Sequence, residues 1–471
     1  MNRILEKIRQ TVITDPDRTA YCVRDKKIGY GSLWQEAEKY ADLLCRQGDS
    51  PVLIIGGKEV DVVIAMIACL SAQRAYVPIR SDTPVPRIRS IAELTGATLI
   101  LSEKEIGIDT ADTLRLSQLT RFAQKEKKTQ NNRIAYMIFT SGSTGDPKGV
   151  PIGVENLENF VGWIGGLYPL CEYRNVTVFN QASFSFDLSV ADFYYALCNG
   201  HTLCALDDDI GDAPERVFQT LFSADVAVMT PTFARLCLLH EEFCAHEMPR
   251  MKCIYFCGEC LDVKTVGKLF TAFPSLEIIN AYGPTEATSA VSAIRITREM
   301  AETLQTLPVG ELATAATDIS IEDGEIVLRG KSVFGGYLGG NAGGYFNENG
   351  VNCYSTGDLG RTEEGLLYCL GRMDRQVKYS GYRIELDDIE RNIGRIPGVK
   401  ECAVVAKKNP EGSVRLIKAF LVTDGTIGEN AVRERLGQLI PAYMTPKSIR
   451  IVERLPVNEN GKTDRKVLES W

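Results

Sequence analysis

The 471-residue sequence predicts an α/β protein with a large N-terminal domain and a small α+β C-terminal domain. Three observations lead to this prediction. The chain is longer than one ordinary domain and has a globular composition, 44% hydrophobic and 24% charged. Apolar runs alternate with helical periods over about the first 300 residues, which is typical of parallel βαβ units. The pattern then changes near residue 308, and again near Asp374.

Short apolar runs bounded by turn residues predict the strands of the large domain. The first are 52–55 and 75–79, with a helix over 60–70 between them and an earlier helix over 30–48, where apolar residues recur at helical spacing. Further strands are predicted at 98–101, 133–139, 176–180, 226–230, 251–257 and 277–281. A region of this size is too large for one sheet, so we expect several subdomains.

The last third of the chain contains two regions with different sequence patterns, which predict different folds. Between about 308 and 370, short alternating strands and glycine-rich turns predict antiparallel hairpins and a small β-barrel. Beyond Asp374, a mixture of strands and helices of about a hundred residues has the size of a small α+β domain. We therefore predict a large domain over 1–373 and a small, mobile domain over 374–471. Its elements are predicted at 386–396 and 429–439 (helices) and at 399–406 and 417–422 (strands).

Charge and hydropathy exclude several classes of protein. The net charge of −8 argues against a general nucleic-acid-binding protein, because such proteins usually carry a basic surplus. The first 18 residues carry charges among their apolar positions, which argues against a signal peptide. No apolar run approaches the length of a membrane span. We expect a cytoplasmic protein without membrane insertion.

The fourteen cysteines are scattered through apolar segments, as expected for reduced, buried thiols. Cys253, Cys257 and Cys260 have a spacing that could suggest a metal site. The segment alternates like a strand, however, and zinc sites favour paired C-x2-C arms. We therefore expect no metal there. Only three histidines are present, which leaves little material for a Ser-His-Asp or Cys-His mechanism.

Residues 136–149, Tyr-Met-Ile-Phe-Thr-Ser-Gly-Ser-Thr-Gly-Asp-Pro-Lys-Gly, form the most informative segment. A predicted buried strand ends in a loop of hydroxyls and glycines, whose backbone N–H groups can cradle an oxyanion. Side-chain donors and one cation add to this, so phosphate binding is favoured over an ordinary solvent loop. The donors are Thr140, Ser141, Ser143, Thr144 and Lys148, with glycines at 142, 145 and 149.

This loop is not a Walker A motif, because Pro147 stands where that motif requires glycine before the lysine. We therefore expect a mobile flap. The segment resembles the signature loop of the adenylate-forming superfamily, which includes acyl-CoA synthetases, luciferases and the adenylation domains of peptide synthetases. The resemblance implies that ATP is a substrate, that Mg²⁺ is required, and that the large domain is an adenylation domain.

Further motifs resemble the same family from about residue 30 to the C-terminus. The ATP-binding residues that the resemblance implies are Thr140, Ser141, Gly142, Ser143, Thr144, Lys148, Asn280, Ala281, Tyr282, Gly283, Pro284, Thr285, Asp358, Cys369, Arg372 and Lys462.

Asp187 lies in the run Phe184-Ser-Phe-Asp-Leu-Ser. A carboxylate between aromatic side chains is costly to bury without a cationic partner. In amino-acid-activating members of the family, an aspartate at this place holds the substrate ammonium, so the resemblance implies an amino-acid substrate. The alternative interpretation is a helix N-cap, which is a common role for aspartate. Fatty-acyl ligases do not need this carboxylate.

The motif Asn280-Ala-Tyr-Gly-Pro-Thr-Glu follows a predicted strand, where α/β folds usually bind ligands. By resemblance, Asn280 contacts the adenine amino group and Tyr282 stacks on the base. Thr285 donates to the α-phosphate, and Glu286 helps to hold Mg²⁺, a hard cation that suits a carboxylate shared with phosphate oxygens. Thr285 and Glu286 are thus catalytic candidates. In isolation, Tyr-Gly-Pro-Thr would be a turn.

The last part of the chain contains further candidate site residues and a candidate hinge. Asp358 in Tyr354-Ser-Thr-Gly-Asp resembles the residue that accepts both ribose hydroxyls, although the segment could also be a hairpin turn. Arg372 resembles a ribose or phosphate contact, and Asp374 a hinge. Lys462 in Asn-Gly-Lys resembles the family's catalytic lysine, which bridges the substrate carboxylate and the α-phosphate as charge develops. Without the other motifs it would be a solvated lysine.

Within the family, the motifs are most similar to those of ligases that load D-alanine onto a carrier protein for teichoic acid D-alanylation. Cys257 and Gly258, in Phe256-Cys-Gly-Glu, match the pocket cysteine that favours the D-enantiomer and its neighbour. Ser289 departs from the usual valine of that pocket, so D-serine, glycine and L-alanine stay open as substrates. No carrier motif follows residue 466, so the phosphopantetheine thiol is expected on a separate carrier protein.

Two other functions stay open. A stand-alone adenylation enzyme of a peptide natural-product pathway would use the same chemistry with another small amino acid and another carrier. A non-catalytic nucleotide-binding regulator is disfavoured, because it would not need Lys462, Asp358, Glu286 and Lys148 together.

Overall fold

The structure is a computed structural model that describes residues 2–116, 133–140, 147–208, 214–312, 317–340, 343–379, 381–409, 414–457 and 463–471. The chain separates into two compact units. The first comprises Met1–Ser81, Leu94–Ile138 and Gly149–Gly371, and the second comprises Asp82–Glu93, Phe139–Lys148 and Arg372–Trp471. A large α/β part and a smaller C-terminal part are thus present, as predicted. The boundary and hinge at Asp374 stay predictions.

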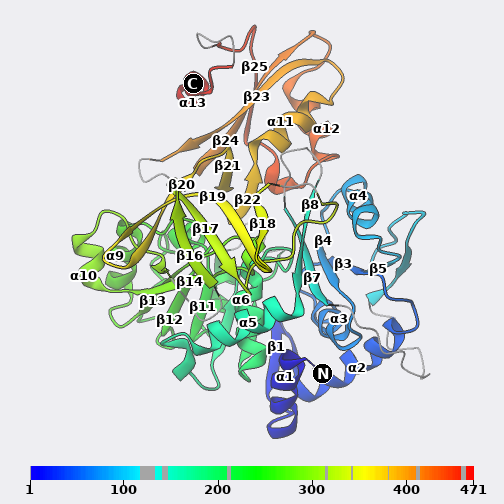
Figure 1. Cartoon of the computed structure of the whole chain (residues 1–471), viewed down its shortest axis with the longest axis vertical. Coiled ribbons are helices and arrows are strands. Elements are labelled where there is room, and N and C mark those ends of the chain that lie inside the picture. The colour runs from blue at the N-terminus through cyan, green and yellow to red at the C-terminus, as the bar shows by residue number, and fades with distance from the viewer. Residues whose placement is uncertain are drawn as a thin grey trace. The chain divides into compact units, whose positions relative to one another are not determined.

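An eight-stranded sheet forms the centre of the first unit (Figure 1). Its inner strands are parallel, and an antiparallel strand closes each edge. In spatial order the strands are β14 (Ser292–Ile296), β13 (Glu277–Tyr282), β12 (Cys253–Phe256), β11 (Val226–Met229), β9 (Thr177–Asn180), β10 (Thr202–Ala205), β1 (Thr19–Val23) and β2 (Lys26–Gly29).

This sheet is apolar on both faces because helices cover both. Along β12, Tyr255 packs into one hydrophobic cluster, whereas Ile254 and Phe256 pack into another. The continuous apolar run that predicted a strand is therefore that of a doubly covered parallel strand. The helices and short 3₁₀ turns of this part are α1 (Arg3–Thr14), α2 (Tyr30–Leu44), α5 (Val154–Gly166), η2 (Leu170–Glu172), α6 (Leu188–Cys198), α7 (Pro214–Leu221), α8 (Pro231–Cys237), α9 (Val263–Ala272), η3 (Thr285–Ala287) and α10 (Arg298–Thr303).

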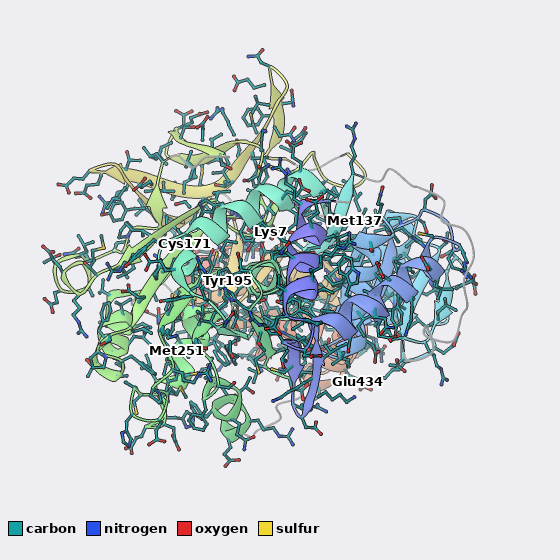
Figure 2. The ribbon with its side chains drawn as sticks, turned by 90° about the horizontal axis from the view of Figure 1, so that it is seen from below. Lys7, Met137, Cys171, Tyr195, Met251 and Glu434 are labelled. Carbon is teal, nitrogen blue, oxygen red and sulfur yellow. The ribbon has the colours of Figure 1, made fainter. Side chains whose placement is uncertain are left out.

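Helix α6 is the central helix of this layer, and every residue from Leu188 to Cys198 is buried. Helix α1 lies against it, with Lys7 on α1 and Tyr195 on α6 seen together in Figure 2. The Tyr195 hydroxyl donates to the carbonyl of Leu170 at 2.9 Å. A helix that is apolar all round must be buried on all sides, and α6 is enclosed in this way.

A second sheet has six strands, most of them parallel. It confirms the prediction that the large α/β region contains more than one sheet. Its order is β6 (Asp112–Leu114), β5 (Leu99–Ser102), β3 (Val52–Gly56), β4 (Tyr76–Arg80), β7 (Ile134–Thr140) and β8 (Lys148–Gly153). Helix α3 (Val60–Ser71) follows β3 and is buried from Val62 to Leu70.

The predicted β-rich region is an antiparallel sheet of six strands. Its strands are β15 (Gly310–Glu311), β20 (Leu366–Arg372), β19 (Val351–Glu363), β17 (Glu325–Gly330) and β16 (Thr317–Glu322), with β18 (Tyr345–Glu348) paired to β19. The hairpin-turn interpretation of the Asp358 segment is wrong. Gly357 has a φ of 72°, but the segment lies inside the long strand β19, because its flanking residues pair with β17.

The second unit contains a three-stranded sheet, a short hairpin and several helices. Apolar side chains such as Ile389, Ile393 and Val404 form its core. Its elements are α4 (Val85–Thr95), β21 (Gln376–Tyr379), β22 (Tyr382–Glu385), α11 (Leu386–Gly394), β23 (Val399–Lys408), β24 (Val414–Thr423), α12 (Glu429–Gly437), η4 (Ala442–Met444), β25 (Ser448–Ile451) and α13 (Arg465–Ser470). Across the described ranges of both units, no helix has the length and apolarity that a membrane span needs.

Candidate functional site

The candidate site of the first unit lies where four parallel strands end. Strands β9, β11, β12 and β13 are parallel neighbours, so their carboxyl ends meet at one edge of the sheet. The segments that carry the sequence motifs follow β9, β12 and β13 directly. Ligands bind at this edge in open α/β sheets, because it presents loop side chains and backbone groups.

Asp187 and Thr285 meet at this edge although 98 residues separate them. The Thr285 hydroxyl donates to Asp187 Oδ2 at 2.7 Å. Asp187 occupies the N-cap position of α6, as the alternative interpretation suggested, but its side chain makes no capping hydrogen bond. The carboxylate is therefore directed to a neighbouring loop rather than to the start of its own helix.

Glu286 is completely buried, with no exposed surface. The Tyr337 hydroxyl donates to Glu286 Oε1, and it also lies 3.1 Å from the Tyr354 hydroxyl. A buried carboxylate needs donors of this kind because ionisation without them is unfavourable. Neither tyrosine is among the predicted site residues, and nothing in the local sequence around Tyr337 marks it.

Tyr282 and Asp358 form a third contact of this type. The Tyr282 hydroxyl donates to Asp358 Oδ2 at 2.7 Å, and both residues are buried. Burial raises the pKa of Tyr282 well above its usual value, and the adjacent Asp358 carboxylate raises it further. Tyr282 is thus a stable donor. Asn280, two residues earlier on β13, donates its amide to the carbonyl of Pro308 at 2.8 Å, which orients its carbonyl oxygen as an acceptor.

The backbone after β13 is tightly constrained. A side chain at Gly283 would place its Cβ 2.5 Å from the Cα of Ala290, so only glycine fits. Ala281 and Pro284 beside it are buried, and Cys369 of β20 packs against the same hydrophobic core. The turn of η3 is therefore held against the segment that follows it, which keeps Thr285 and Glu286 in place.

Cys257 and Ser289 lie together at the end of β12. The Cys257 thiol donates to the carbonyl of Ser289 at 3.8 Å. Thr288 and Ser289 both have left-handed backbone angles, with φ of 62° and 71°, which is a strained arrangement for two successive residues with side chains. Gly258 has a φ of 90°, which glycine adopts without strain. The Ser289 hydroxyl is buried and has no hydrogen-bond partner within the described part of the chain.

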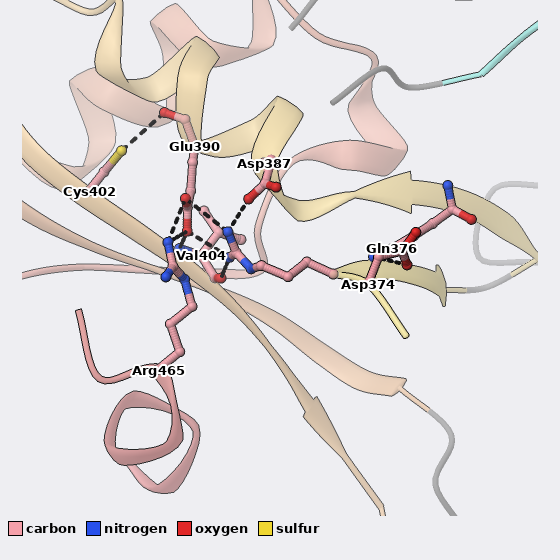
Figure 3. Close-up of polar contacts among 8 residues, drawn as sticks. Asp374, Gln376, Asp387, Glu390, Cys402, Val404 and Arg465 are labelled. Atoms are coloured by element: carbon pink, nitrogen blue, oxygen red, sulfur yellow. Dashed lines mark hydrogen bonds and ion pairs between the residues drawn. The ribbon is translucent and has the colours of Figure 1, made fainter. Parts of the chain in front are cut away.

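Among the described residues, the second unit contains the predicted site residues Thr140, Lys148, Arg372 and Asp374. Arg372 forms an ion pair with Asp374, whose carboxylate also accepts a hydrogen bond from the Gln376 N–H at 3.1 Å (Figure 3). Burial alone would raise the pKa of Asp374, but the hydrogen bonds and charge of Arg372 lower it overall. Thr140 ends β7 and Lys148 begins β8. Lys148 lies near enough to Glu385 to oppose the rise in pKa that burial causes there.

Glu390 of α11 joins distant parts of the second unit (Figure 3). Its carboxylate pairs with Arg375 at 2.7 Å and with Arg465 of α13 at 3.1 Å, and it accepts the Val404 N–H at 2.7 Å. Burial opposes ionisation, but these donors together lower the pKa of Glu390. The start of α13 is therefore tied to the segment that follows Asp374.

Several predicted residues lie outside the described residues. Ser141, Gly142, Ser143 and Thr144 of the phosphate loop belong to this group, as does Lys462. Their predicted roles, and the predicted mobile flap, stay predictions.

The carboxylates of the first unit show what kind of metal ion the site could hold. Within the described ranges, no group of three or more His, Cys, Asp or Glu side chains could enclose a metal ion, and this includes the segment with Cys253, Cys257 and Cys260. Glu286 is a single buried carboxylate beside hydroxyl groups. This donor set fits a Mg²⁺ ion that keeps water and phosphate oxygens as its other ligands.

The fold and this arrangement of strand-end carboxylates define a nucleotide-binding α/β enzyme, and comparison with known proteins gives its family. The model of the AMP-binding enzyme family matches residues 8–338, and the model of the AMP-binding enzyme C-terminal domain matches residues 388–462. The chain belongs to this family of adenylate-forming enzymes.

The similarity to individual proteins covers nearly the whole chain. The sequence is 35% identical to the D-alanine–D-alanyl carrier protein ligase of Bacillus cytotoxicus and 34% identical to that of Bacillus licheniformis, with 99% of both chains covered in each comparison. Among solved structures, the Vibrio cholerae adenylation domain AlmE with glycyl-adenosine-5'-phosphate has a TM-score of 0.84 at 23% identity, covering 99% of this chain and 97% of that one. Holo-PA1221, which contains adenylation and PCP domains, also has a TM-score of 0.84, at 24% identity over 99% and 83% of the two chains. These two structures share the fold.

Proposed function

We propose that this protein is a D-alanine–carrier protein ligase. It would convert ATP and D-alanine to D-alanyl-AMP and pyrophosphate. It would then transfer the D-alanyl group to the phosphopantetheine thiol of a separate carrier protein. The observation that carries the proposal is the full-length similarity to ligases of this name. We place the reaction in the cytoplasm, where ATP is available, and teichoic acid D-alanylation is its expected pathway.

The geometry of the first unit supports an amino-acid substrate. Asp187 is the proposed acceptor of the substrate ammonium, and the Thr285 hydroxyl at 2.7 Å holds one of its oxygens. A neutral hydroxyl donor orients a carboxylate and, unlike a cationic donor, does not neutralise its charge. A fatty-acyl substrate would have no partner for this carboxylate.

The nucleotide would be held by residues at the end of β13 and directly after it, and by residues of β19. Asn280 offers its carbonyl oxygen to the adenine amino group, since its amide is bound to Pro308. Tyr282 contributes its ring to the base, and Asp358 accepts the ribose hydroxyls. Glu286 would hold Mg²⁺, which neutralises charge on the phosphates when it is bound. Lys148, Arg372 and Lys462 are the proposed cations around the phosphates, and Lys462 stabilises the charge that develops during adenylation.

We propose that the amino-acid pocket prefers the D-enantiomer of alanine because of Cys257. Its thiol, bound to the Ser289 carbonyl, provides a small, apolar wall after β12. A small wall on one side of the substrate α-carbon and a larger one on the other would distinguish enantiomers.

One observation favours a second candidate substrate. The buried Ser289 hydroxyl lacks a partner among the described residues, and a buried hydroxyl without a partner is costly. A substrate hydroxyl could supply that partner, which makes D-serine the second candidate. A natural-product adenylation enzyme is less well supported, because the relatives that span the chain are D-alanine–carrier ligases.

The test is amino-acid-dependent exchange of pyrophosphate into ATP with D-alanine, L-alanine, D-serine, L-serine and glycine. We expect D-alanine to give the highest kcat/KM. A higher value with D-serine would move the substrate assignment to the second candidate. A lack of exchange with all five amino acids would refute the proposed substrate class.

A further inference from the structure

A buried lysine lies beneath the loop that carries Asp187. Lys58 follows β3 and has only 2% of its surface exposed. Its ammonium donates to the side-chain oxygen of Asn180 and to the carbonyl of Ala182, and it stands 4.7 Å from the centre of the Phe184 ring. Lys58 therefore contacts three residues of the segment that runs from the end of β9 to Asp187.

Asn180 extends these contacts to helix α6. Its amide donates to Asp192 Oδ2 at 2.8 Å and to the Ala182 carbonyl at 3.1 Å. Asp192 is fully buried in α6, and its Oδ1 has no hydrogen-bond partner in the described ranges. We call Lys58, Asn180 and Asp192 the Lys58 network.

The Lys58 network holds the loop from both sides. Asn180 is the last residue of β9, and Asp192 lies in the second turn of α6. The Ala182 carbonyl between them receives two hydrogen bonds from the network. Asp187 is therefore carried by a loop whose beginning is fixed by Lys58 and whose end is fixed through α6.

The burial of this network is unfavourable in itself. Burial lowers the pKa of Lys58 to about 8, although the nearby carboxylates of Asp208 and Asp192 oppose this shift. Burial also raises the pKa of Asp192 to about 8, opposed by the charge of Lys58 and the hydrogen bond from Asn180. Apolar side chains of similar volume commonly pack at least as stably as buried charges. A buried ammonium at this position is better explained by the geometry that it imposes than by stability.

Lys58 does not act as a direct ligand in this arrangement. Its ammonium is directed to Asn180, to Ala182 and to the ring of Phe184, and all three belong to the protein. Along the loop that Lys58 contacts, the first residue with a proposed role is Asp187. Any influence on the reaction must pass through the loop.

We propose that Lys58 is a positioning residue for the amino-acid subsite, because it fixes the loop that places Asp187 for the substrate ammonium. This inference rests on the proposed function, since it gives Asp187 the role stated there. The nucleotide residues after β13 make no contact with Lys58 among the hydrogen bonds of the described residues, so the effect is confined to the amino acid.

The first experiment compares Lys58→Met with Arg74→Met. Arg74 is also buried in the first unit, at 1% exposure, and donates to the carbonyls of Leu44 and Ser50, away from the Asp187 loop. In pyrophosphate exchange, Lys58→Met should raise KM for the amino acid roughly tenfold, the effect of losing a charged hydrogen bond. KM for ATP should stay within about twofold. Arg74→Met should lower Tm without separating the two KM values.

A double-mutant cycle with Asp187→Asn shows whether Lys58 acts through Asp187. If it does, Lys58→Met should raise KM for the amino acid much less in the Asp187→Asn background than in the native protein. Equal effects in the two backgrounds would overturn the proposal, as would an equal rise of both KM values or the same separation in Arg74→Met.

Two further variants keep the outcomes distinct. If Lys58→Met does not fold, Asp192→Leu takes its place. Leucine has a similar volume but cannot accept the hydrogen bond of the Asn180 amide, so KM for the amino acid should also rise selectively; an unchanged KM would overturn the proposal. If Asp187→Asn alone leaves KM for the amino acid unchanged, the proposed function of Asp187 fails. If Asp187→Asn raises that KM and Lys58→Met does not, only the inference about Lys58 fails.

Discussion

The three carboxylates of the proposed site share one chemical feature. Asp187 accepts from the Thr285 hydroxyl, Glu286 from Tyr337, and Asp358 from Tyr282. A neutral hydroxyl donor orients a carboxylate and leaves its negative charge in place, whereas an arginine or lysine would cancel it. Their proposed partners are the substrate ammonium for Asp187, a Mg²⁺ ion for Glu286 and the ribose hydroxyls for Asp358.

The contact between Tyr337 and Glu286 gives a first prediction at this scale. Tyr337→Phe removes the donor, so Glu286 should bind Mg²⁺ in a less defined orientation. We expect the Mg²⁺ concentration for half-maximal pyrophosphate exchange to rise about tenfold. The matched control is Tyr345→Phe, since Tyr345 also packs edge-on against Phe334 but donates to Asn352. The same rise in both variants would remove Tyr337 from the metal site.

Cys257 gives a second prediction. Cys257→Ala opens space beside the Ser289 carbonyl, so the ratio of kcat/KM for D-alanine to that for L-alanine should fall severalfold, by about 1 kcal/mol of discrimination. Cys253→Ala is the control, because Cys253 lies four residues earlier and is buried in the same core cluster. An unaltered ratio in Cys257→Ala would return this thiol to ordinary core packing.

The raised pKa of Asp192 leads us to predict that the stability of the protein depends on pH. Its folded-state pKa of about 8 lies above its ordinary value of 3.8 because of burial. The folded protein therefore keeps a proton that the unfolded chain releases, and stability falls as pH rises from about 4 to about 8, by at most about 1.4 kcal/mol per pH unit. Lys58 has the opposite effect, but only above about pH 8, where its lowered pKa lies.

Unfolding of the native protein and of Asp192→Asn at pH 5 to 8 tests this dependence. The native protein should lose stability relative to the variant as the pH rises. Parallel curves would show that the carboxylate of Asp192 does not retain its proton.

At the scale of elements, the turn between β13 and β14 does most to arrange the site. It contains η3, the two left-handed residues Thr288 and Ser289, and Gly283 against Ala290. The Thr288 hydroxyl donates to the Ser332 carbonyl at 2.8 Å, which ties the turn to the segment after β17. A single short turn thereby positions Thr285, Glu286 and the Ser289 carbonyl, which are the proposed phosphate contact, the proposed metal ligand and part of the proposed amino-acid pocket.

Gly283 gives the prediction at this scale. In Gly283→Ala, the added Cβ would meet backbone atoms of Ala290 rather than a movable side chain, so the turn must shift. We expect a loss of about 1–3 kcal/mol in stability and at least a tenfold loss of kcat/KM for ATP in pyrophosphate exchange. Gly267→Ala in α9, with open space around its Cβ, should have little effect on either measurement. Normal activity in Gly283→Ala would show that the turn adapts.

At the scale of the whole molecule, the proposed reaction needs residues from both compact units. Asp187, Glu286 and Asp358 belong to the first, whereas Arg372 and the segment that contains Lys462 belong to the second. Glu390, through Arg375 and Arg465, connects the segment after Asp374 with the start of α13. The hinge at Asp374, about which one unit would move during the reaction, stays a prediction.

Lys462 supplies the prediction at this scale. Lys462→Ala should reduce pyrophosphate exchange at least a hundredfold, because a cation aimed at developing charge is a large catalytic term. ATP binding, measured by calorimetry, should change little. Lys466→Ala, four residues further on, is the control. Unchanged pyrophosphate release in Lys462→Ala would remove this residue from the mechanism.

The elements of the fold were predictable from local pattern. Apolar runs and helical periods placed the strands and helices of the α/β region within a few residues, because periodicity reflects which face is buried. The motifs at strand ends also marked the candidate site. The Asp358 segment was partly misjudged, since Thr-Gly-Asp has the composition of a turn but continues a strand that pairs with β17. Pairing with a distant strand overrode local composition there.

The sequence by itself determined the α/β class, the positions of the motifs and the kinds of side chain available to a nucleotide and an amino acid. Only the tertiary structure decided which of them meet. Thr285 and Asp187 are 98 residues apart, Tyr282 and Asp358 are 76 apart, and Lys58 and Asn180 are 122 apart. Local pattern reports burial and periodicity, whereas such contacts depend on how sheets and loops pack, which no short segment contains.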